Sequence, residues 1–391
     1  MADPVPTDRR GFPTAEFEAR LARAQAIMRA RRLDALLATT PQNVRYFTGF
    51  DSQFWESPTR PWFVVVPLEG APVAVIPEIG APEMARTWVG DVRTWPAPVP
   101  EDDGVSLLAG ALDAAPRRFG RIGAELGREM ALRMPVVDLT RLRGALASEI
   151  VDGAPALWAL RMVKSDAEID RIAAICRIAG DAYEALPARL SIGETEREAA
   201  RRLRIDLARR GADSTPFLPA ISGPGGVAQI VCGPGDRALE RGDVLFVDTG
   251  STFDGYFCDF DRIFAVGALS DAAARAHDAL WRATEAGIAA AVPGATTDAV
   301  FAAMARVLED AGAVGGNVGR LGHGLGLQLT EPPSLRPGDG TRLVENMALT
   351  IEPGMAYAPG RMIVHEENIV VGEDGPRLLT RRAPREPAVI R

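Results

Sequence analysis

Hydrophobic and polar positions divide the chain into two parts with different patterns. In the first part, apolar residues with helical spacing are followed by short apolar runs typical of β-strands, at 17–32 and then at 34–39, 62–68, 72–77 and 121–126. Alternation of helical segments with short buried strands is typical of an α/β domain. We therefore predict a small α/β domain at the N-terminal end.

A long helix is predicted to begin the second part. In the stretch RMVKSDAEIDRI, Ser165 and Glu168 have the spacing of a capping box, in which each side chain accepts a hydrogen bond from the other residue's backbone N–H. A chain of 391 residues is also too long for one ordinary core. We predict two domains, at residues 1–154 and 155–391.

The second part contains a faint internal repeat. An offset of 101 residues (294 minus 193) places GETEREAARRLRIDLARRGA (193–212) over GATTDAVFAAMARVLEDAGA (294–313), with matching residues at both ends. Alanine-rich helices align easily by chance, but each copy continues into strand-like sequence. The pattern predicts an α+β domain built from a duplicated helix–helix–strand unit with pseudo-twofold symmetry.

The segment 243–267 has the pattern of a β-hairpin with acidic residues in both arms. If its Phe-Asp-Gly turn lies at 253–254, Asp248 and Asp259 are almost equally far from the turn. We therefore expect the two carboxylates to face each other across the strands. Such a pair destabilises a sheet unless a cation lies between the carboxylates or one is protonated. Alternatively, one Asp only caps the turn.

Three further residues suit metal coordination. His323 lies in LGHGLGL, Glu352 in LTIEPGM and Glu366 in MIVHEENIVV, and both glutamates interrupt apolar, strand-like runs. An ionised carboxylate in such a run is costly unless it is paired or bound to a metal. A single Glu there is usually an edge-strand or salt-bridge residue, but two of them with the Asp pair indicate a metal site.

These motifs resemble those of the pita-bread metallohydrolase family. The resemblance rests on Asp-x10-Asp, Gly-His-Gly, Ile-Glu-Pro-Gly and the late Glu, and it extends to PQNVRYFTGF (41–50) in the first domain. The family contains methionine aminopeptidase, aminopeptidase P, prolidase and the metal-free creatinase. The resemblance implies a C-terminal pita-bread domain preceded by a creatinase-type α/β domain.

The resemblance also implies the role of each of the five residues. Asp248 would bind the first metal, Asp259 and Glu366 would bridge both metals, and His323 and Glu352 would complete the second. Glu352 is then the expected proton shuttle, with His323 beside it in the catalytic centre. Such an oxygen-rich set favours two divalent ions, with Mn expected first and Fe, Co or Zn as alternatives.

The chain departs from the family pattern where its peptidases carry substrate-contacting histidines. No histidine lies in 222–236, where Cys232 is either a substitute or a small buried residue. Seven residues after His323 the chain has Thr330, and the following Glu331 either binds a substrate cation or holds a loop. Asp261 replaces the usual Thr, and it either orders a ligand or water or pairs with an arginine.

The two remaining histidines do not replace those missing. We expect His277 to face solvent on a helix and His365 to point away from Glu366 on its strand. The aromatic stretch with Trp55, Arg60 and Trp62 either packs within its own domain or, as two-domain relatives imply, covers the active site of a partner in a homodimer.

Composition excludes several other classes. The net charge of −8 argues against a general nucleic-acid or anionic-membrane surface. No apolar run approaches the ~20 residues that span a bilayer, and the N-terminus lacks the apolar segment of a secretory signal. Three cysteines without a CxxC pattern indicate neither a disulfide framework nor a zinc knuckle. We expect a cytoplasmic protein.

Hydrolysis of an amide bond in a small molecule or short peptide, by default an Xaa-Pro dipeptide, is the leading functional hypothesis. The missing histidines leave open a second enzyme class, in which the same scaffold acts on a small zwitterion, including lyase chemistry of the dimethylsulfoniopropionate-cleaving type. A binding protein that has lost catalysis is disfavoured because all five metal-binding positions are retained.

Overall fold

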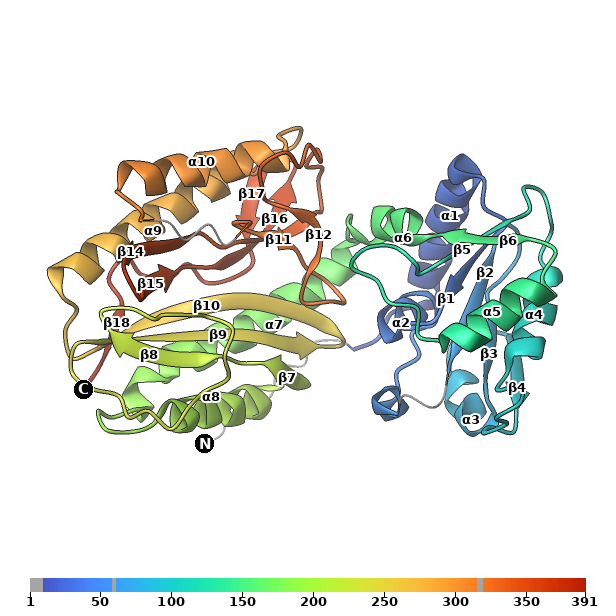
Figure 1. The fold of residues 1–391 in the computed structure, drawn as a ribbon, viewed down its shortest axis with the longest axis horizontal. Helices are drawn as coiled ribbons and strands as arrows, with labels where there is room; N and C mark the ends of the chain where they lie inside the picture. Colours follow the sequence, from blue (N-terminus) through green and yellow to red (C-terminus); the bar gives the residue numbers. More distant parts are fainter. Residues whose placement is uncertain (1–9, 58–60, 315–318) are drawn as a thin grey trace. The chain divides into compact units, whose positions relative to one another are not determined.

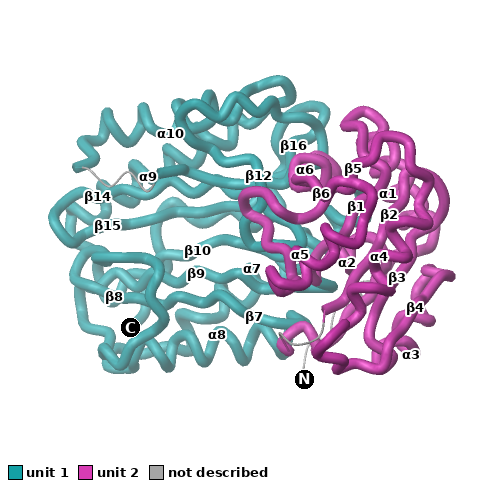
Figure 2. The backbone as a smooth tube through the Cα atoms, turned by 45° about the vertical axis from the view of Figure 1, so that its right-hand side comes forward, with its two compact units in different colours: residues 1–9, 162–391 teal, residues 10–161 magenta. Residues whose placement is uncertain are grey.

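The computed structural model describes residues 10–57, 61–314 and 319–391. These residues form two compact units, residues 10–161 and 162–391 (Figure 2). The dividing point follows helix α6, and the predicted boundary between 154 and 155 lies at the start of that helix.

The N-terminal unit is a mixed sheet with helices packed on it. Its strands lie in the order β4-β3-β2-β1-β5-β6, and β1 pairs antiparallel with β2 but parallel with β5. The elements are α1 (Thr14–Arg31), β1 (Ala35–Ala38), α2 (Pro41–Thr48), β2 (Phe63–Pro67), β3 (Val73–Pro77), α3 (Ala81–Met84), β4 (Asp91–Trp95), α4 (Val105–Asp113), β5 (Arg121–Ala124), α5 (Val136–Ala145), β6 (Glu149–Asp152) and α6 (Ala154–Arg161), with short 3-10 turns at Gln53–Glu56 and Glu78–Gly80.

The predicted α/β pattern of this unit is confirmed. The four apolar runs form β1, β2, β3 and β5, whose residues are almost all buried. Strands β4 (DVRTW) and β6 (EIVD) were not predicted because polar residues interrupt their short apolar runs and most of their residues are at least partly exposed. Edge strands of this kind lack the apolar signature of central strands.

The C-terminal unit contains two pairs of long helices and two five-stranded sheets (Figure 1). The sheets have the orders β18-β10-β9-β7, with β8 also on β9, and β12-β11-β13-β16-β17. The elements are α7 (Asp166–Ala185), α8 (Glu196–Arg210), β7 (Ser214–Phe217), β8 (Ala220–Pro224), β9 (Asp243–Phe253), β10 (Tyr256–Val266), α9 (Asp271–Ala290), α10 (Thr297–Asp310), β11 (His323–Gly324), β12 (Glu331–Ser334), β13 (Ala348–Ile351), β14 (Gly354–Ala358), β15 (Arg361–Val364), β16 (Glu367–Gly372), β17 (Gly375–Leu378) and β18 (Ala388–Ile390), with a 3-10 turn at Pro187–Arg189.

The duplication inferred from the sequence is present in this unit. Helix α7 packs on β9 and β10 and α8 on β7 and β8, while α9 packs on β13, β14 and β15 and α10 on α9. Helices α8 and α10 follow equivalent threonines, and each threonine forms an isolated bridge to a later segment. The sheets therefore lie between two outer helix pairs (Figure 1).

Local sequence explains where the first long helix of this unit begins. The Ser165 side chain accepts from the Glu168 N–H and the Glu168 carboxylate accepts from the Ser165 N–H, so the predicted capping box is confirmed. Among the described residues, no helix has the length and the apolar character that a membrane crossing requires.

Candidate metal centre

The hairpin formed by β9 and β10 carries three aspartates, but its register differs from the expected one. Asp248 lies opposite Asp261, and Asp259 lies opposite Gly250. The prediction that Asp248 faces Asp259 is therefore wrong. The two-residue turn is Asp254-Gly255, whose positive φ angles of 49° and 79° suit an Asp-Gly hairpin turn.

All three aspartates nevertheless share one face of the hairpin. Asp259 is two residues from Asp261 on the same strand, so alternation directs both side chains to the same side. Asp248 pairs with Asp261 and is therefore the diagonal neighbour of Asp259. The hairpin thus gathers three carboxylates on one face, an arrangement that destabilises a sheet unless a cation or a proton compensates their charge.

The second sheet brings the histidine to the same place. His323 lies in the short strand β11, and its N–H donates to the Thr350 hydroxyl at 3.1 Å. The glycines on either side permit close packing, since a Cβ at Gly322 would lie 2.4 Å from the Thr350 carbonyl oxygen and one at Gly324 would lie 2.3 Å from that of Pro332. The Gly-His-Gly motif therefore has a steric cause.

The two glutamates lie just outside strands rather than within them. Glu352 follows β13, and its N–H donates to the Leu321 carbonyl at 3.1 Å. Glu366 lies between β15 and β16. One ligand atom from each of Asp259, His323 and Glu366 lies within 4.8 Å of the others. Residues far apart in sequence thus converge at one point.

The His323 ring presents a lone pair to two carboxylates. Its Nδ1 lies 2.9 Å from the Gly324 carbonyl oxygen, which only accepts, so Nδ1 carries the proton. Its Nε2 lies 3.5 Å from Asp259 Oδ2 and 3.4 Å from Glu352 Oε1. Burial lowers the pKa of His323 to about 4, which leaves Nε2 unprotonated at neutral pH. Three electron-pair donors therefore face one another.

The carboxylates are poorly compensated by protein groups. Desolvation raises the pKa of Asp248 and of Glu352 to about 7. Burial, followed by the neighbouring carboxylates, raises the pKa of Asp259, Asp261 and Glu366 well above the usual range. Asp248 Oδ1 and Glu366 Oε1 are buried and have no hydrogen-bond partner among the described residues. This oxygen-rich set with one neutral imidazole suits divalent cations.

The cluster is open on one side. Asp259, His323 and Glu366 are buried, whereas Asp248 is partly exposed and the Glu352 side chain is 24% exposed. Substrate would therefore approach past Asp248 and Glu352.

Asp261 has no arginine partner within the described part of the chain. Both of its carboxylate oxygens are buried without a hydrogen bond. The adjacent Arg262 instead donates to the Asp261 backbone carbonyl and forms an ion pair with Glu367 at 3.1 Å. This arrangement favours the alternative in which Asp261 orders a ligand or water.

Glu331, Thr330 and Cys232 lie at or near the positions where the family resemblance leads us to expect histidines. Glu331 is buried and forms an ion pair with Lys164 at 3.1 Å, which favours the loop-holding alternative. Thr330 accepts a hydrogen bond from Arg320 at 3.4 Å. Cys232 is exposed, which does not fit a small buried residue, and no described hydrogen bond joins its side chain to the cluster.

The aromatic segment of the N-terminal unit packs internally. Trp62 is fully buried, with its ring centroid 5.1 Å from that of Phe50 and 5.8 Å from that of Trp55. Arg133 lies over the Trp55 ring at 5.2 Å. Arg60 lies outside the described residues. The role of Trp55 and Trp62 in covering a partner's active site stays a prediction.

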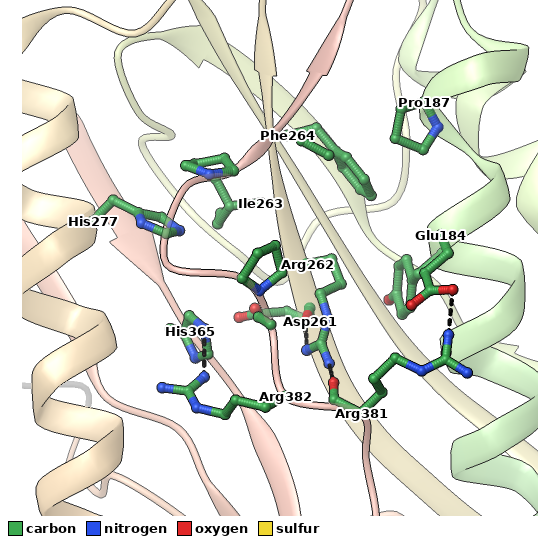
Figure 3. A pocket seen from close by; sticks show the side chains of 16 residues that line it. Glu184, Pro187, Asp261, Arg262, Ile263, Phe264, His277, His365, Arg381 and Arg382 are labelled. Atoms are coloured by element: carbon green, nitrogen blue, oxygen red, sulfur yellow. Dashed lines mark hydrogen bonds and ion pairs between the residues drawn. The ribbon is translucent and has the colours of Figure 1, made fainter.

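His277 is buried, so the expectation that it faces solvent is wrong. Helix α9 turns it inward, and its ring lies 6.1 Å from that of His365. Both rings line a cavity of about 360 Å³ (Figure 3). Arg382 donates to His365 Nε2 at 3.1 Å, and the other nitrogen lies 3.2 Å from the Thr284 hydroxyl. The His365 side chain thus points away from Glu366 and contacts Arg382 and Thr284, and the predicted direction is confirmed.

Two residues beside the cluster, Asn368 and Arg320, were not predicted from the sequence. The Asn368 amide bonds both backbone groups of Asp259, accepting from its N–H at 2.9 Å and donating to its carbonyl. Arg320, three residues before His323, has a guanidinium whose charge lowers the pKa of Glu352 against the larger effect of desolvation. Asn368 could have been singled out from the sequence only as a polar residue beside the apolar run that follows Glu366.

Comparison with known proteins identifies the family. The pattern of metallopeptidase family M24 matches residues 170–373, which is more than half of the chain, and that of the creatinase/prolidase N-terminal domain matches residues 20–163. The chain belongs to metallopeptidase family M24. Its fold is accordingly the pita-bread domain with a creatinase-type N-terminal domain, as predicted.

Relatives of the M24 chain span nearly its whole length. It is 31% identical over 390 residues to the protein named "Probable dipeptidase PepE" of Mycobacterium tuberculosis, covering 97% of this chain and 98% of that one. The crystal structure of dipeptidase PepE from Mycobacterium ulcerans has 34% identity and a TM-score of 0.84, covering 97% and 99% of the two chains.

More distant relatives agree in fold. The prolidase of Thermococcus sibiricus has a TM-score of 0.85 at 23% identity, covering 97% of this chain and all of that one. At that identity the likeness shows the fold alone. The chain is thus a metallopeptidase-family enzyme, and these comparisons favour peptidase over lyase chemistry.

Proposed function

We propose that this M24 enzyme is a dinuclear metal-dependent dipeptidase, with Xaa-Pro dipeptides as the first substrates to test. One observation carries the proposal: the unprotonated Nε2 of His323 lies 3.5 Å from Asp259 Oδ2 and 3.4 Å from Glu352 Oε1. The printed names of relatives, dipeptidase and Xaa-Pro dipeptidase, support the substrate class.

The proposed ligands are the five residues singled out by sequence. Asp248 would bind one ion, Asp259 and Glu366 would bridge, and His323 and Glu352 would bind the other. The unpartnered oxygens of Asp248 and Glu366 support this assignment because a buried carboxylate oxygen without a donor is otherwise destabilising. Manganese is the proposed ion, with iron, cobalt or zinc as alternatives.

Bound divalent ions supply Lewis-acid polarisation of a scissile carbonyl and lower the pKa of water. The chain's own residues then orient the substrate and move a proton. Glu352 is the proposed proton carrier because its carboxylate is partly exposed and lies 3.4 Å from His323 Nε2, at the edge of the proposed metal site. His323 keeps a fixed tautomer through the Gly324 carbonyl.

Metal analysis and a substrate panel test the proposal. Purified protein supplied with Mn²⁺ or Co²⁺ should hold about two ions per chain, and it should hydrolyse Ala-Pro and other dipeptides but lose activity in chelator. Fewer than one ion per chain, or cleavage of a small zwitterion such as dimethylsulfoniopropionate instead of dipeptides, would overturn it. We also propose that the protein is a homodimer, as the family resemblance implies, and sedimentation measurements on the same sample test this.

A further inference from the structure

Arg320 is a cation with spare hydrogen-bonding capacity beside the metal cluster. Over the described ranges, its guanidinium makes one hydrogen bond, to the Thr330 hydroxyl at 3.4 Å, and forms no ion pair. A guanidinium carries five N–H donors. The nearby cations Lys164 and Arg262 differ, since each is paired with a buried glutamate.

Backbone contacts place Arg320 next to the open side of the cluster. The Leu321 carbonyl accepts from the Glu352 N–H at 3.1 Å, so the residue before it lies beside Glu352. The partner Thr330 directly precedes Glu331, whose strand β12 pairs with β11, the strand that carries His323. The side chain is partly exposed. Arg320 therefore borders the route past Glu352 by which substrate would enter.

The surrounding charge leaves a place for an anion. The proposed ligands are acidic and would be neutralised by two divalent ions, whereas Arg320 has no carboxylate of its own. The Thr330 hydroxyl accepts a hydrogen bond from the Arg320 guanidinium and holds it in place. An arginine fork matches the two oxygens of a carboxylate and forms charge-assisted hydrogen bonds with them.

We propose that Arg320, held by Thr330, binds the terminal carboxylate of a dipeptide and selects dipeptides over longer or capped peptides. In a dipeptide the carboxylate lies one residue beyond the scissile bond, roughly 3.5 Å along the chain, so its partner must adjoin the metal cluster. This inference rests on the proposed dipeptidase function, and it names a specificity residue of that site.

Matched substrates test the inference on the metal-loaded, full-length protein. The kcat/KM for Ala-Pro and for Ala-Pro amide is compared in the wild type, Arg320→Met and Arg336→Met. Arg336 is an exposed control whose described hydrogen bond is to the Pro337 carbonyl. Because hydrogen bonds to charged groups contribute about 1.5–3 kcal/mol, Arg320→Met should lower the preference for the free acid by about 10- to 100-fold.

The remaining readouts separate specificity from structure. Metal content of Arg320→Met should equal that of the wild type, Thr330→Val should lose part of the acid preference, and Arg336→Met should keep all of it. Equal losses on both substrates, or an unchanged acid-to-amide ratio, overturn the inference while leaving the dipeptidase function intact. A wild type that is metal-loaded but cleaves no dipeptide overturns the proposed function, and the inference with it.

Discussion

Replacing Asn368 by Ala should weaken both the fold and metal binding. The Asn368 amide joins β16 to the edge of β10, and it satisfies the N–H and the carbonyl of Asp259. Each buried backbone group left without a partner costs roughly 1–3 kcal/mol. The middle of that range, about 2 kcal/mol for each group, gives about 4 kcal/mol for the pair. For a unit of this size, each kcal/mol lowers Tm by roughly 2–4 °C. We expect Tm to fall by about 8–16 °C.

The effect on metal binding distinguishes positioning from simple packing. Since Asn368 fixes the backbone of Asp259 and lies two residues after Glu366, its loss should shift the two proposed bridging carboxylates. Loss of such an orienting group typically lowers metal affinity about 10- to 100-fold. Titration calorimetry with Mn²⁺ measures this, and Ile369→Val, a buried neighbour that keeps both hydrogen bonds, is the control. Unchanged Mn²⁺ affinity in Asn368→Ala at a temperature where it is folded would refute the reasoning.

Four further outcomes are expected. Desolvation raises the folded-state pKa of Asp248 and Glu352 to about 7, above unfolded values of about 4. Between these pH values the folded protein in chelator binds more protons than the unfolded chain. Its Tm should therefore fall from pH 5 to pH 8. Saturating Mn²⁺ should remove that trend because binding displaces the protons, and a Tm in chelator that rises with pH would contradict the linkage. Glu352→Gln should lower kcat at least about 100-fold on Ala-Pro, and near-normal kcat would exclude it as proton carrier. Lys164→Met leaves Glu331 buried without its lysine and should lower the free energy of unfolding in urea by about 3–5 kcal/mol. Adding Glu331→Gln should recover most of that loss, and a double variant as unstable as the single variant would show that the unpaired Glu331 charge is not its cause. Trp62→Ala should destabilise the N-terminal unit by about 3–5 kcal/mol. If the KM of this variant for Ala-Pro is unchanged at a temperature where the variant is folded, Trp62 does not help to cover the substrate.

Local patterns predicted the fold well because they depend on few neighbours. The capping box at Ser165 and Glu168 and the buried runs that form β1 and β2 follow from residues adjacent in sequence. The duplicated unit was detectable because equivalent helix boundaries need equivalent residues in both copies.

Register and burial were harder because they depend on small or distant details. A shift of the turn from 253–254 to Asp254-Gly255 moved the partner of Asp248 from Asp259 to Asp261. His277 is buried because α9 packs on a second sheet, which helical periodicity alone does not reveal. The contact between Arg320 and Thr330 depends on how the intervening loop closes. Long-range packing decides such features.

The division of the proposed ligands between the two sheets has a consequence for biosynthesis. Asp248 and Asp259 belong to the first repeat, whereas His323, Glu352 and Glu366 belong to the second. A ribosome adding ~5–20 residues per second needs roughly 6–24 s to travel the 118 residues (366 minus 248) between the first and last of them. The two aspartates of the hairpin are therefore synthesised well before the histidine and the two glutamates, and the full set of proposed ligands exists only in the nearly completed chain.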